Sequence, residues 1–256
     1  MRAPAVLVMA VALSTLVGCA TVHRPRGAQP IAAVSATTAE DAWSALLARR
    51  AALTSVQAYL RIRATAGQSS RSFRATLSRD SGQRTLVEAL TPLGTAAFTL
   101  FSDGREAVFI DHLDRKFWRG PASSLASIAG DLVPTIDLAE LALLTAGLPI
   151  DSALPARRCE SCIAEAGRIV MQQGEVLYTV GSAGLAGAVI RRGGEQLKID
   201  YSPASFPPSA INIGRYLAES PSPVESLQIQ ILDLVSDPAA VKPPVIPADY
   251  SCCAGR

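Results

Sequence analysis

The sequence has few aromatic residues, very little histidine and almost no excess of charge. Aromatic residues make up 5% of its 256 residues, and there are two histidines. Lysine and arginine number 24 against 22 aspartate and glutamate residues, which gives a formal net charge of +2. Nucleic-acid-binding proteins normally carry a clear basic excess, so we expect no nucleic-acid partner. Two histidines leave little material for a histidine-rich metal site or a serine-type triad.

Apolar residues are abundant instead and reach 49%, whereas charged residues make up 18%. A chain with this apolar share and so low a net charge is not expected to be disordered. It is also long enough to bury a core without help from disulfides or metals. The composition therefore predicts one medium-sized globular domain, with an interior lined mainly by aliphatic side chains.

The N-terminus carries a targeting signal. Arg2 precedes an uncharged apolar run over residues 3–17, which is short for a membrane span. The run ends in Leu16-Val17-Gly18-Cys19, which resembles the lipobox of bacterial lipoproteins, whose cysteine is acylated before cleavage. Residues 1–18 would then be a signal peptide, and Cys19 would carry a stable lipid anchor. Ala20 after the cysteine implies outer-membrane sorting in the enterobacterial scheme. The alternative is an ordinary secretory signal with an accidental cysteine.

Four further cysteines are candidates for disulfides: Cys159, Cys162, Cys252 and Cys253. Disulfides persist in exported chains, and four cysteines allow three complete pairings. Cys159 and Cys162 have the spacing of a redox pair or of half a zinc site. No thioredoxin-like pattern surrounds them, and two adjacent cysteines are poorly placed to ligate one tetrahedral ion. We expect one or two structural disulfides, one arrangement being a link between the C-terminal tail and the 155–165 loop, with redox and metal roles as alternatives.

The first part of the chain predicts a tether, a helix and a run of strands. Residues 19–36 contain two prolines and few large apolar groups, which is typical of a lipid-anchored tether. A helix is predicted over about 38–52, because threonines precede acidic residues and apolar residues then recur at helical spacing. Alternating apolar and polar residues next predict strands over 56–63, 72–77, 85–90, 95–101, 106–111 and 116–118.

The alternation then gives way to helical spacing. Leu125, Ile128 and Leu132 share one face of a predicted helix, and a second helix is predicted over 137–146 with Gly147 at its end. Residues 236–256 contain four prolines and no periodicity, which predicts a loose tail. Strand patterns lie between, over 175–180, 187–190, 196–201, 210–213 and 226–234.

This order of elements predicts a mainly β (α+β) fold over residues 37–235. One highly curved antiparallel sheet would have its concave face covered by helices, which either fill it or leave a ligand cavity. The stretch Leu90-Thr91-Pro92-Leu93-Gly94, the Ser102-Asp103-Gly104 turn and the helix ending in Gly147-Leu148-Pro149 resemble the LolB family of outer-membrane lipoprotein receptors. The resemblance extends over roughly residues 40–235 in element order. It implies a single incomplete antiparallel β-barrel with an N-terminal helix and a helical lid over an apolar cavity.

The resemblance implies that the cavity takes the acyl chains of lipoproteins and that a soluble periplasmic LolA-like carrier is a partner. It also implies that Pro92, Leu93 and Gly94 form a tip whose leucine contacts the bilayer. A leucine folded back under the rim of the sheet is the alternative.

A carrier of acyl chains needs aliphatic surface without unpaired polar groups. Ordinary core packing is the alternative for each residue that supplies such surface. The candidates for the lipid cavity are Leu60, Ile62, Leu77, Leu86, Phe98, Leu100, Val108, Ile110, Leu125, Ile128, Leu132, Leu227, Ile229 and Ile231.

Two short segments resemble catalytic motifs, but each lacks a feature that the motif requires. Gly181-Ser182-Ala183-Gly184 lacks the Gly-x-Ser-x-Gly spacing of a nucleophile elbow. Asp111-His112-Leu113-Asp114 follows a strand and has no third partner, so we interpret it as a solvated turn. We expect no enzymatic activity, no cofactor and no metal site.

The hypothesis is a monomeric lipoprotein anchored in the outer membrane, with its domain facing the periplasm. It would accept acylated lipoproteins from the carrier and help to insert them. The alternatives are a carrier of another lipid or glycolipid, and a structural or interaction lipoprotein with a filled barrel.

Overall fold

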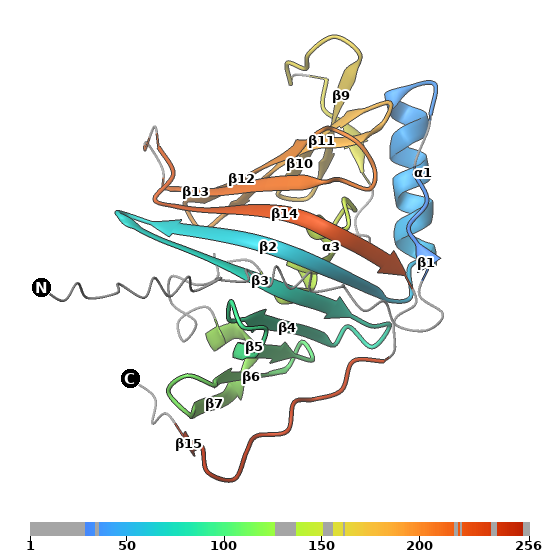
Figure 1. Cartoon of the computed structure of the whole chain (residues 1–256). Coiled ribbons are helices and arrows are strands. Elements are labelled where there is room, and N and C mark those ends of the chain that lie inside the picture. Colours follow the sequence, from blue (N-terminus) through green and yellow to red (C-terminus); the bar gives the residue numbers. More distant parts are fainter. Residues whose placement is uncertain are drawn as a thin grey trace, which may run out of the picture.

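The computed structural model describes residues 29–33, 36–125, 137–150, 156–160, 162–217, 220, 222–236 and 240–252. These residues form one long, strongly twisted sheet with two helices on its inner face (Figure 1). Most of the buried apolar side chains form one core cluster that includes residues of α1, α3 and both halves of the sheet.

The first half of the sheet is an antiparallel meander with short turns. In chain order its strands are β2 (Val56–Ala66), β3 (Ser69–Arg79), β4 (Thr85–Leu90), β5 (Ala96–Ser102), β6 (Glu106–Asp111) and β7 (Lys116–Pro121). The second half is β9 (Arg168–Gln173), β10 (Val176–Gly181), β11 (Gly184–Arg192), β12 (Glu195–Ser202), β13 (Ala210–Leu217) and β14 (Glu225–Ser236).

Antiparallel pairing of β2 with β14 joins the two halves into one sheet. The strand order is β15-β7-β6-β5-β4-β3-β2-β14-β13-β12-β11-β10-β9-β8, with β8 (Arg157–Arg158) and β15 (Ser251–Cys252) at the two edges. These edges do not pair with each other among the described strands, so the barrel is incomplete. The prediction of a mainly β, antiparallel and unclosed architecture is confirmed in these terms.

Helix α1 (Ala39–Ala52) begins where the sequence predicts it. The Thr38 hydroxyl accepts a hydrogen bond from the Asp41 N–H at 3.1 Å, which caps the first turn. Acidic residues in the first turn and arginines in the last complement the helix dipole. Trp43 packs on Tyr178 of β10 with 5.2 Å between ring centroids. The helix therefore covers the inner face of the second half of the sheet.

Helix α3 (Leu138–Thr145) lies inside the curve of the sheet (Figure 1). The carboxylate of Asp137 accepts a hydrogen bond from the Ala139 N–H at 2.7 Å and caps the helix. Gly147 ends it with φ of +69°, a conformation that disfavours side chains. A short helix that is apolar on all sides is stable only when it is enclosed, and most of this one is buried: Leu138, Leu141, Ala142, Leu143, Leu144 and Thr145.

The predicted helix before α3 is only partly visible. A short 3-10 turn, η1 (Ala122–Ser124), leads to Leu125, which is buried in the main core. Ile128 and Leu132 lie outside the described residues. Within the described residues, we find no helix that combines the length and the hydropathy needed to cross a membrane.

The prediction of a loose C-terminal tail is wrong for residues 240–252, which we call the C-terminal strap. The strap crosses the outer face of β4–β7 (Figure 1), and Val241 is buried there. The Val241 N–H donates to a carboxylate oxygen of Asp80 at 3.2 Å, and β15 pairs in parallel with β7. Near the N-terminal end of the described residues, β1 (Gln29–Pro30), inside the predicted tether, pairs with β14.

Candidate functional site

The inner face of the sheet carries most of the predicted cavity residues. Leu60, Leu77 and Leu100 belong to the main core together with α1 and α3, and each is 1% exposed. The other predicted residues that pack into the same core are Ile62, Phe98, Leu125, Leu227, Ile229 and Ile231. Their position on the inner face is established, and contact with a lipid stays a prediction.

Three predicted cavity residues lie on the opposite face. Leu86, Val108 and Ile110 pack against Val241 and the C-terminal strap, so their assignment to the cavity is wrong. Strand β6 has apolar side chains on both of its faces, because the strap covers the outer one. The pattern of such a strand does not show which side chains point inward.

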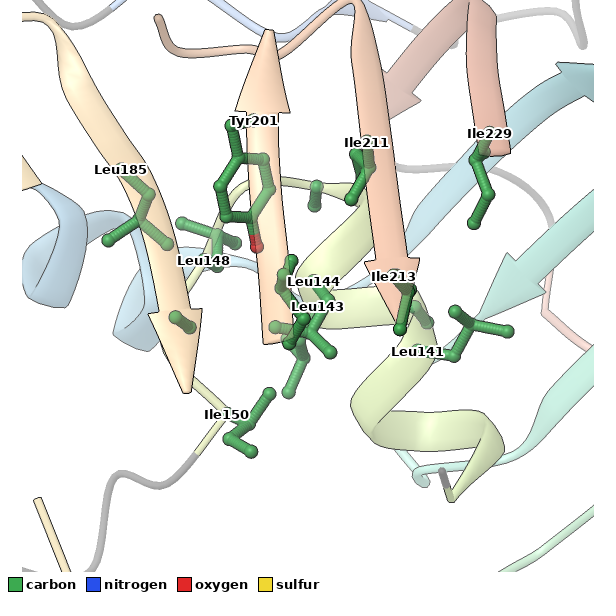
Figure 2. Packing of buried hydrophobic residues seen from close by; sticks show 14 of the residues in the cluster. Leu141, Leu143, Leu144, Leu148, Ile150, Leu185, Tyr201, Ile211, Ile213 and Ile229 are labelled. Atoms are coloured by element: carbon green, nitrogen blue, oxygen red, sulfur yellow. The ribbon is translucent and has the colours of Figure 1, made fainter. Parts of the chain in front are cut away.

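The centre of the inner face is filled by α3. Figure 2 shows Leu141, Leu143 and Leu144 of this helix lying against the side chains of β12 and β13. An ion pair links the helix to the sheet. Nη1 and Nη2 of Arg192 donate to the Glu140 carboxylate at 2.9 and 2.6 Å. These hydrogen bonds also raise the pKa of Arg192. Any ligand that reaches this part of the face must displace α3.

A row of half-buried phenylalanines crosses the inner face away from that packed centre. Phe73, Phe98 and Phe109 come from β3, β5 and β6, with ring centroids 5.5 Å apart for the first pair and 6.2 Å for the second. Small Ala89 of β4 lies between the first two and leaves room for their contact. Of the three, only Phe98 was predicted from the sequence as a cavity residue. Phe73 and Phe109 also point inward, but only the strand register shows that they lie next to Phe98.

Leu93 stands at the tip of the β4–β5 hairpin and is 92% exposed. A hydrogen bond of 2.9 Å from the Gly94 N–H to the Thr91 carbonyl closes the turn, and Gly94 has φ of +82°. The hydroxyls of Thr91 and Thr95 lie 2.8 Å apart across its base. The alternative of a leucine folded back under the rim is therefore wrong, and Pro92, Leu93 and Gly94 form a projecting tip.

The Asp111-His112-Leu113-Asp114 segment is a turn, as predicted. One carboxylate oxygen of Asp111 accepts hydrogen bonds from the N–H groups of Leu113 and Asp114. His112 is not a solvated residue, because its ring nitrogens lie 2.9 Å from the Thr99 hydroxyl and 3.1 Å from the Tyr250 hydroxyl of the strap. Leu113 projects from this turn and is 71% exposed.

Polar atoms without hydrogen-bond partners lie on the inner face. Among the described residues these include the Tyr201 hydroxyl, the Thr145 hydroxyl and Nε of Arg79. Burial raises the pKa of Tyr201 far above its ordinary value, and the nearby Tyr178 raises it further. Burial lowers the pKa of Arg79, and the positive charge of Arg50 adds to that effect. Such groups cost stability until a partner reaches them.

A polar cleft of about 600 Å³ lies where the β11–β12 hairpin meets the end of β13. Its lining includes three cations, Arg191, Arg192 and Lys198, and the glycines of the turn at 193–194. Glu195 also lines the cleft, and Arg192 and Lys198 are paired with Glu140 and Asp200, so little of this charge is free. The polar lining offers little surface to an acyl chain.

The cysteines form one local disulfide. Cys159 is bonded to Cys162, with 5.4 Å between their Cα atoms, in the loop between β8 and β9. A link from this loop to the C-terminal tail is therefore wrong. Cys252 is exposed on β15, whereas Cys19 and Cys253 lie outside the described residues. In the described part of the chain no group of three or more potential ligands could hold a metal ion.

The fold and these surfaces define an unclosed antiparallel half-barrel with helices on its concave face. Solved structures with some similarity include a LolA superfamily protein from Nitrosomonas europaea, at 13% identity and a TM-score of 0.48, over 80% of this chain and 96% of that one. Another is a domain from Vibrio parahaemolyticus described as an outer membrane lipoprotein-sorting protein, at 10% identity, a TM-score of 0.48 and the same shares of each chain.

A third is a DUF1329 family protein from Desulfovibrio piger, at 10% identity and a TM-score of 0.46, with coverage of 80% and 96%. No protein-family model matches the chain, and no curated protein matches it. At these identities and TM-scores, the similarities do not establish what this chain binds.

Proposed function

We propose that this chain is an outer-membrane lipoprotein that binds the acyl chains of other lipoproteins on its concave face and helps to insert them into the membrane. The observation that carries the proposal is the pairing of a fully projecting leucine tip with an apolar inner face. Leu93 is 92% exposed, and the half-buried phenylalanine row begins on the inner face of the same strands. The lipobox at Cys19 adds an anchor that keeps the domain at the membrane.

An acyl chain would enter at the phenylalanine row. Each buried methylene contributes about 0.8 kcal/mol, so a chain that covers this row and displaces part of α3 is held without covalent chemistry. Transfer to the bilayer needs no nucleotide, because the bilayer buries the same methylenes at least as well. A soluble LolA-like carrier would be the donor.

Helix α3 acts as the lid in this proposal. In the absence of ligand it occupies the centre of the inner face, capped by Asp137 and held by the Arg192–Glu140 pair. Binding then requires α3 to move outward, so that ligand and helix compete for the same aliphatic side chains. Affinity is reduced by the free energy that docks the helix.

The dense packing at Leu60, Leu77 and Leu100 favours a second candidate, a structural or interaction lipoprotein whose barrel stays filled. A carrier of another lipid or glycolipid uses the same surface and differs only in its cargo. The two classes give opposite results when the purified protein is examined for bound lipid.

The test is to purify the chain from residue 20 onward from the periplasm and to record its native mass before and after organic extraction. We expect extra mass that extraction removes, and uptake of a fluorescent fatty acid afterwards. An unliganded mass together with no uptake would establish the filled barrel and reject the carrier. The extracted lipid distinguishes lipoprotein acyl chains from other lipids.

The tip is tested by Leu93→Glu, with Ile163→Glu as the matched control. Ile163 is 99% exposed, in the loop between β8 and β9, and that loop lies at the other end of the strands. We expect Leu93→Glu to bind fatty acid normally and to fail in transferring an acylated lipoprotein to vesicles. Normal transfer by this variant would remove the tip from the mechanism.

A further inference from the structure

The ends of three successive hairpins lie along one sloping line. The residue pairing between neighbouring strands can be followed from each hairpin back to β3. Measured across the strands in this way, Leu93 is level with Arg71, and Leu113 is level with Arg74. The β2–β3 turn at 67–68 lies three residues further out, so each tip is set back by about three residues, or roughly 10 Å, from the one before. The hairpins are two strands apart, which is also about 10 Å.

A line with equal steps along and across the strands is inclined at about 45° to them. Strands in barrels are tilted against the barrel axis by a similar angle. The three tips therefore lie at one level on the barrel, and a flat surface can contact all of them. We call the residues at and next to these tips, 63–71, 91–95 and 112–115, the rim.

The rim combines single apolar side chains with unpaired positive charge. Leu93 and Leu113 are its exposed apolar residues. Residues 56–79 contain five arginines and no acidic residue, and four of the arginines are exposed: Arg61, Arg63, Arg71 and Arg74. None of these four forms an ion pair within the described part of the chain.

The arginines are placed at a cost to the fold. Arg61 lies directly across from Arg74 in the β2–β3 register, and like charges at opposed positions destabilise a hairpin. Within the described residues, Arg61 donates to the side-chain oxygen of Gln230 and Arg63 to the Ser70 hydroxyl, and both partners are neutral. The polar cleft lined by Arg191 and Lys198 lies at the same end of the strands, because β11 ends and β12 begins there.

We propose that the rim is a membrane-docking surface that prefers anionic phospholipid, with Leu93 and Leu113 as two apolar anchors and Arg63 and Arg71 as the headgroup contacts. Lipids rearrange around separate anchors, and arginine next to a bilayer gains from its negative surface potential. A protein partner of comparable affinity would need a continuous complementary patch of roughly 1,000 Å² in total, whereas these two leucines stand on different hairpins.

This inference shares Leu93 with the proposed function and needs no acyl cargo. Vesicle binding and fatty-acid uptake are therefore measured separately on the same samples. If the chain takes up fatty acid but does not bind vesicles, the rim proposal fails and the proposed function stands. If it binds vesicles but takes up no fatty acid, the proposed function fails and the rim proposal stands.

The experiment uses the chain from residue 20 onward, which lacks the lipid anchor and contains every described element. Sedimentation with phosphatidylcholine vesicles is compared with sedimentation with vesicles that also contain phosphatidylglycerol. We expect binding to the anionic vesicles to be at least tenfold stronger and to weaken as salt is raised. Equal binding to the two kinds of vesicle would overturn the preference for anionic lipid.

Two variants test the rim residues. Arg63→Gln with Arg71→Gln should weaken binding to anionic vesicles about 25-fold, since each arginine near the surface contributes roughly fivefold. Leu113→Ser should weaken binding to vesicles of both compositions about tenfold. The controls are Arg105→Gln and Ile163→Ser, both exposed at the other end of the strands.

Thermal unfolding of each variant confirms that its fold is intact, which is expected because all of these side chains are exposed. Rim variants that bind vesicles as well as the controls would overturn the proposal. So would a rim that binds no vesicles and instead retains a soluble periplasmic protein, in a manner lost with Arg63→Gln and Arg71→Gln.

Discussion

Weakening the attachment of α3 should make the protein bind fatty acid better. The substitution is Glu140→Gln, which keeps the shape of the side chain and removes its charge. Glu140 is 22% exposed and its partner Arg192 is 46% exposed, so the pair is partly screened by water. Because the pair is bidentate, we place its contribution at about 1 kcal/mol, the upper end for exposed pairs.

The size of the effect follows from the competition between helix and ligand. If α3 must leave the inner face before an acyl chain binds, a loss of about 1 kcal/mol raises the open population about fivefold. The apparent affinity for fatty acid should rise by the same factor. The melting temperature should fall by roughly 2–4 °C, because the ligand-free protein unfolds from the closed state, which the substitution destabilises.

The assay is titration with a fluorescent fatty acid, combined with thermal unfolding of the ligand-free protein. Glu40→Gln is the matched control, because Glu40 of α1 forms a separate exposed ion pair with Arg158 of β8, at 3.0 Å. High salt should bring the wild-type affinity toward that of Glu140→Gln. A lower melting temperature with unchanged affinity would refute the idea that α3 is a lid.

Three predictions concern buried polar groups. Burial alone would raise the pKa of Asp80, but hydrogen bonds from Arg84 and from the Val241 N–H outweigh it and hold the pKa below its ordinary value. This carboxylate stabilises the fold above its unfolded pKa of about 3.9, and the contribution is lost as pH falls through the lower folded pKa. Asp80→Asn should therefore lower the free energy of unfolding by about 2 kcal/mol at pH 7 in urea titrations, a difference that shrinks toward pH 2, and should speed amide exchange in the strap. An equal difference at both pH values would contradict this assignment. Tyr201→Phe should leave stability unchanged or raise it by about 1 kcal/mol, because the lost hydroxyl has no partner among the described residues. Tyr178→Phe should lower stability by about 1 kcal/mol in the same denaturation assay, since its hydroxyl accepts the Ile150 N–H at 3.0 Å. A marked loss of stability in Tyr201→Phe would mean that its hydroxyl is bonded in solution.

Local signals in the sequence were sufficient for the regular elements. Leu60 and Ile62 alternate with Arg61 and Arg63, and this period of two predicts a strand with one buried face. Thr38 followed by two acids likewise places the start of α1. In both segments the polar and apolar sides are distinct, so periodicity decides the structure.

The same reasoning fails where both sides of a strand are covered. In β6 the apolar run around Val108 contains no polar position to mark the outer face, and the strap that buries it lies over 130 residues away in the chain. The strap itself has no period, because its backbone is extended and rich in proline, and isolated residues such as Val241 make its contacts. Only the folded structure shows that Val108 and Val241 meet.

The two ends of the inner face also differ in polarity, and the sequence of no single strand shows this. At the rim end it carries half-buried phenylalanines and exposed leucines, which suit an acyl chain and a bilayer. At the opposite end of β3 it carries Arg79, which is 6% exposed and lies near Arg50 and Asp137. A charged group buried there opposes entry of an apolar chain, because it would lose what remains of its electrostatic partners. An acyl chain would therefore enter and leave at the rim, next to the surface proposed to contact the membrane. Under the proposed function, delivery would require no rotation of the protein between binding its cargo and releasing it.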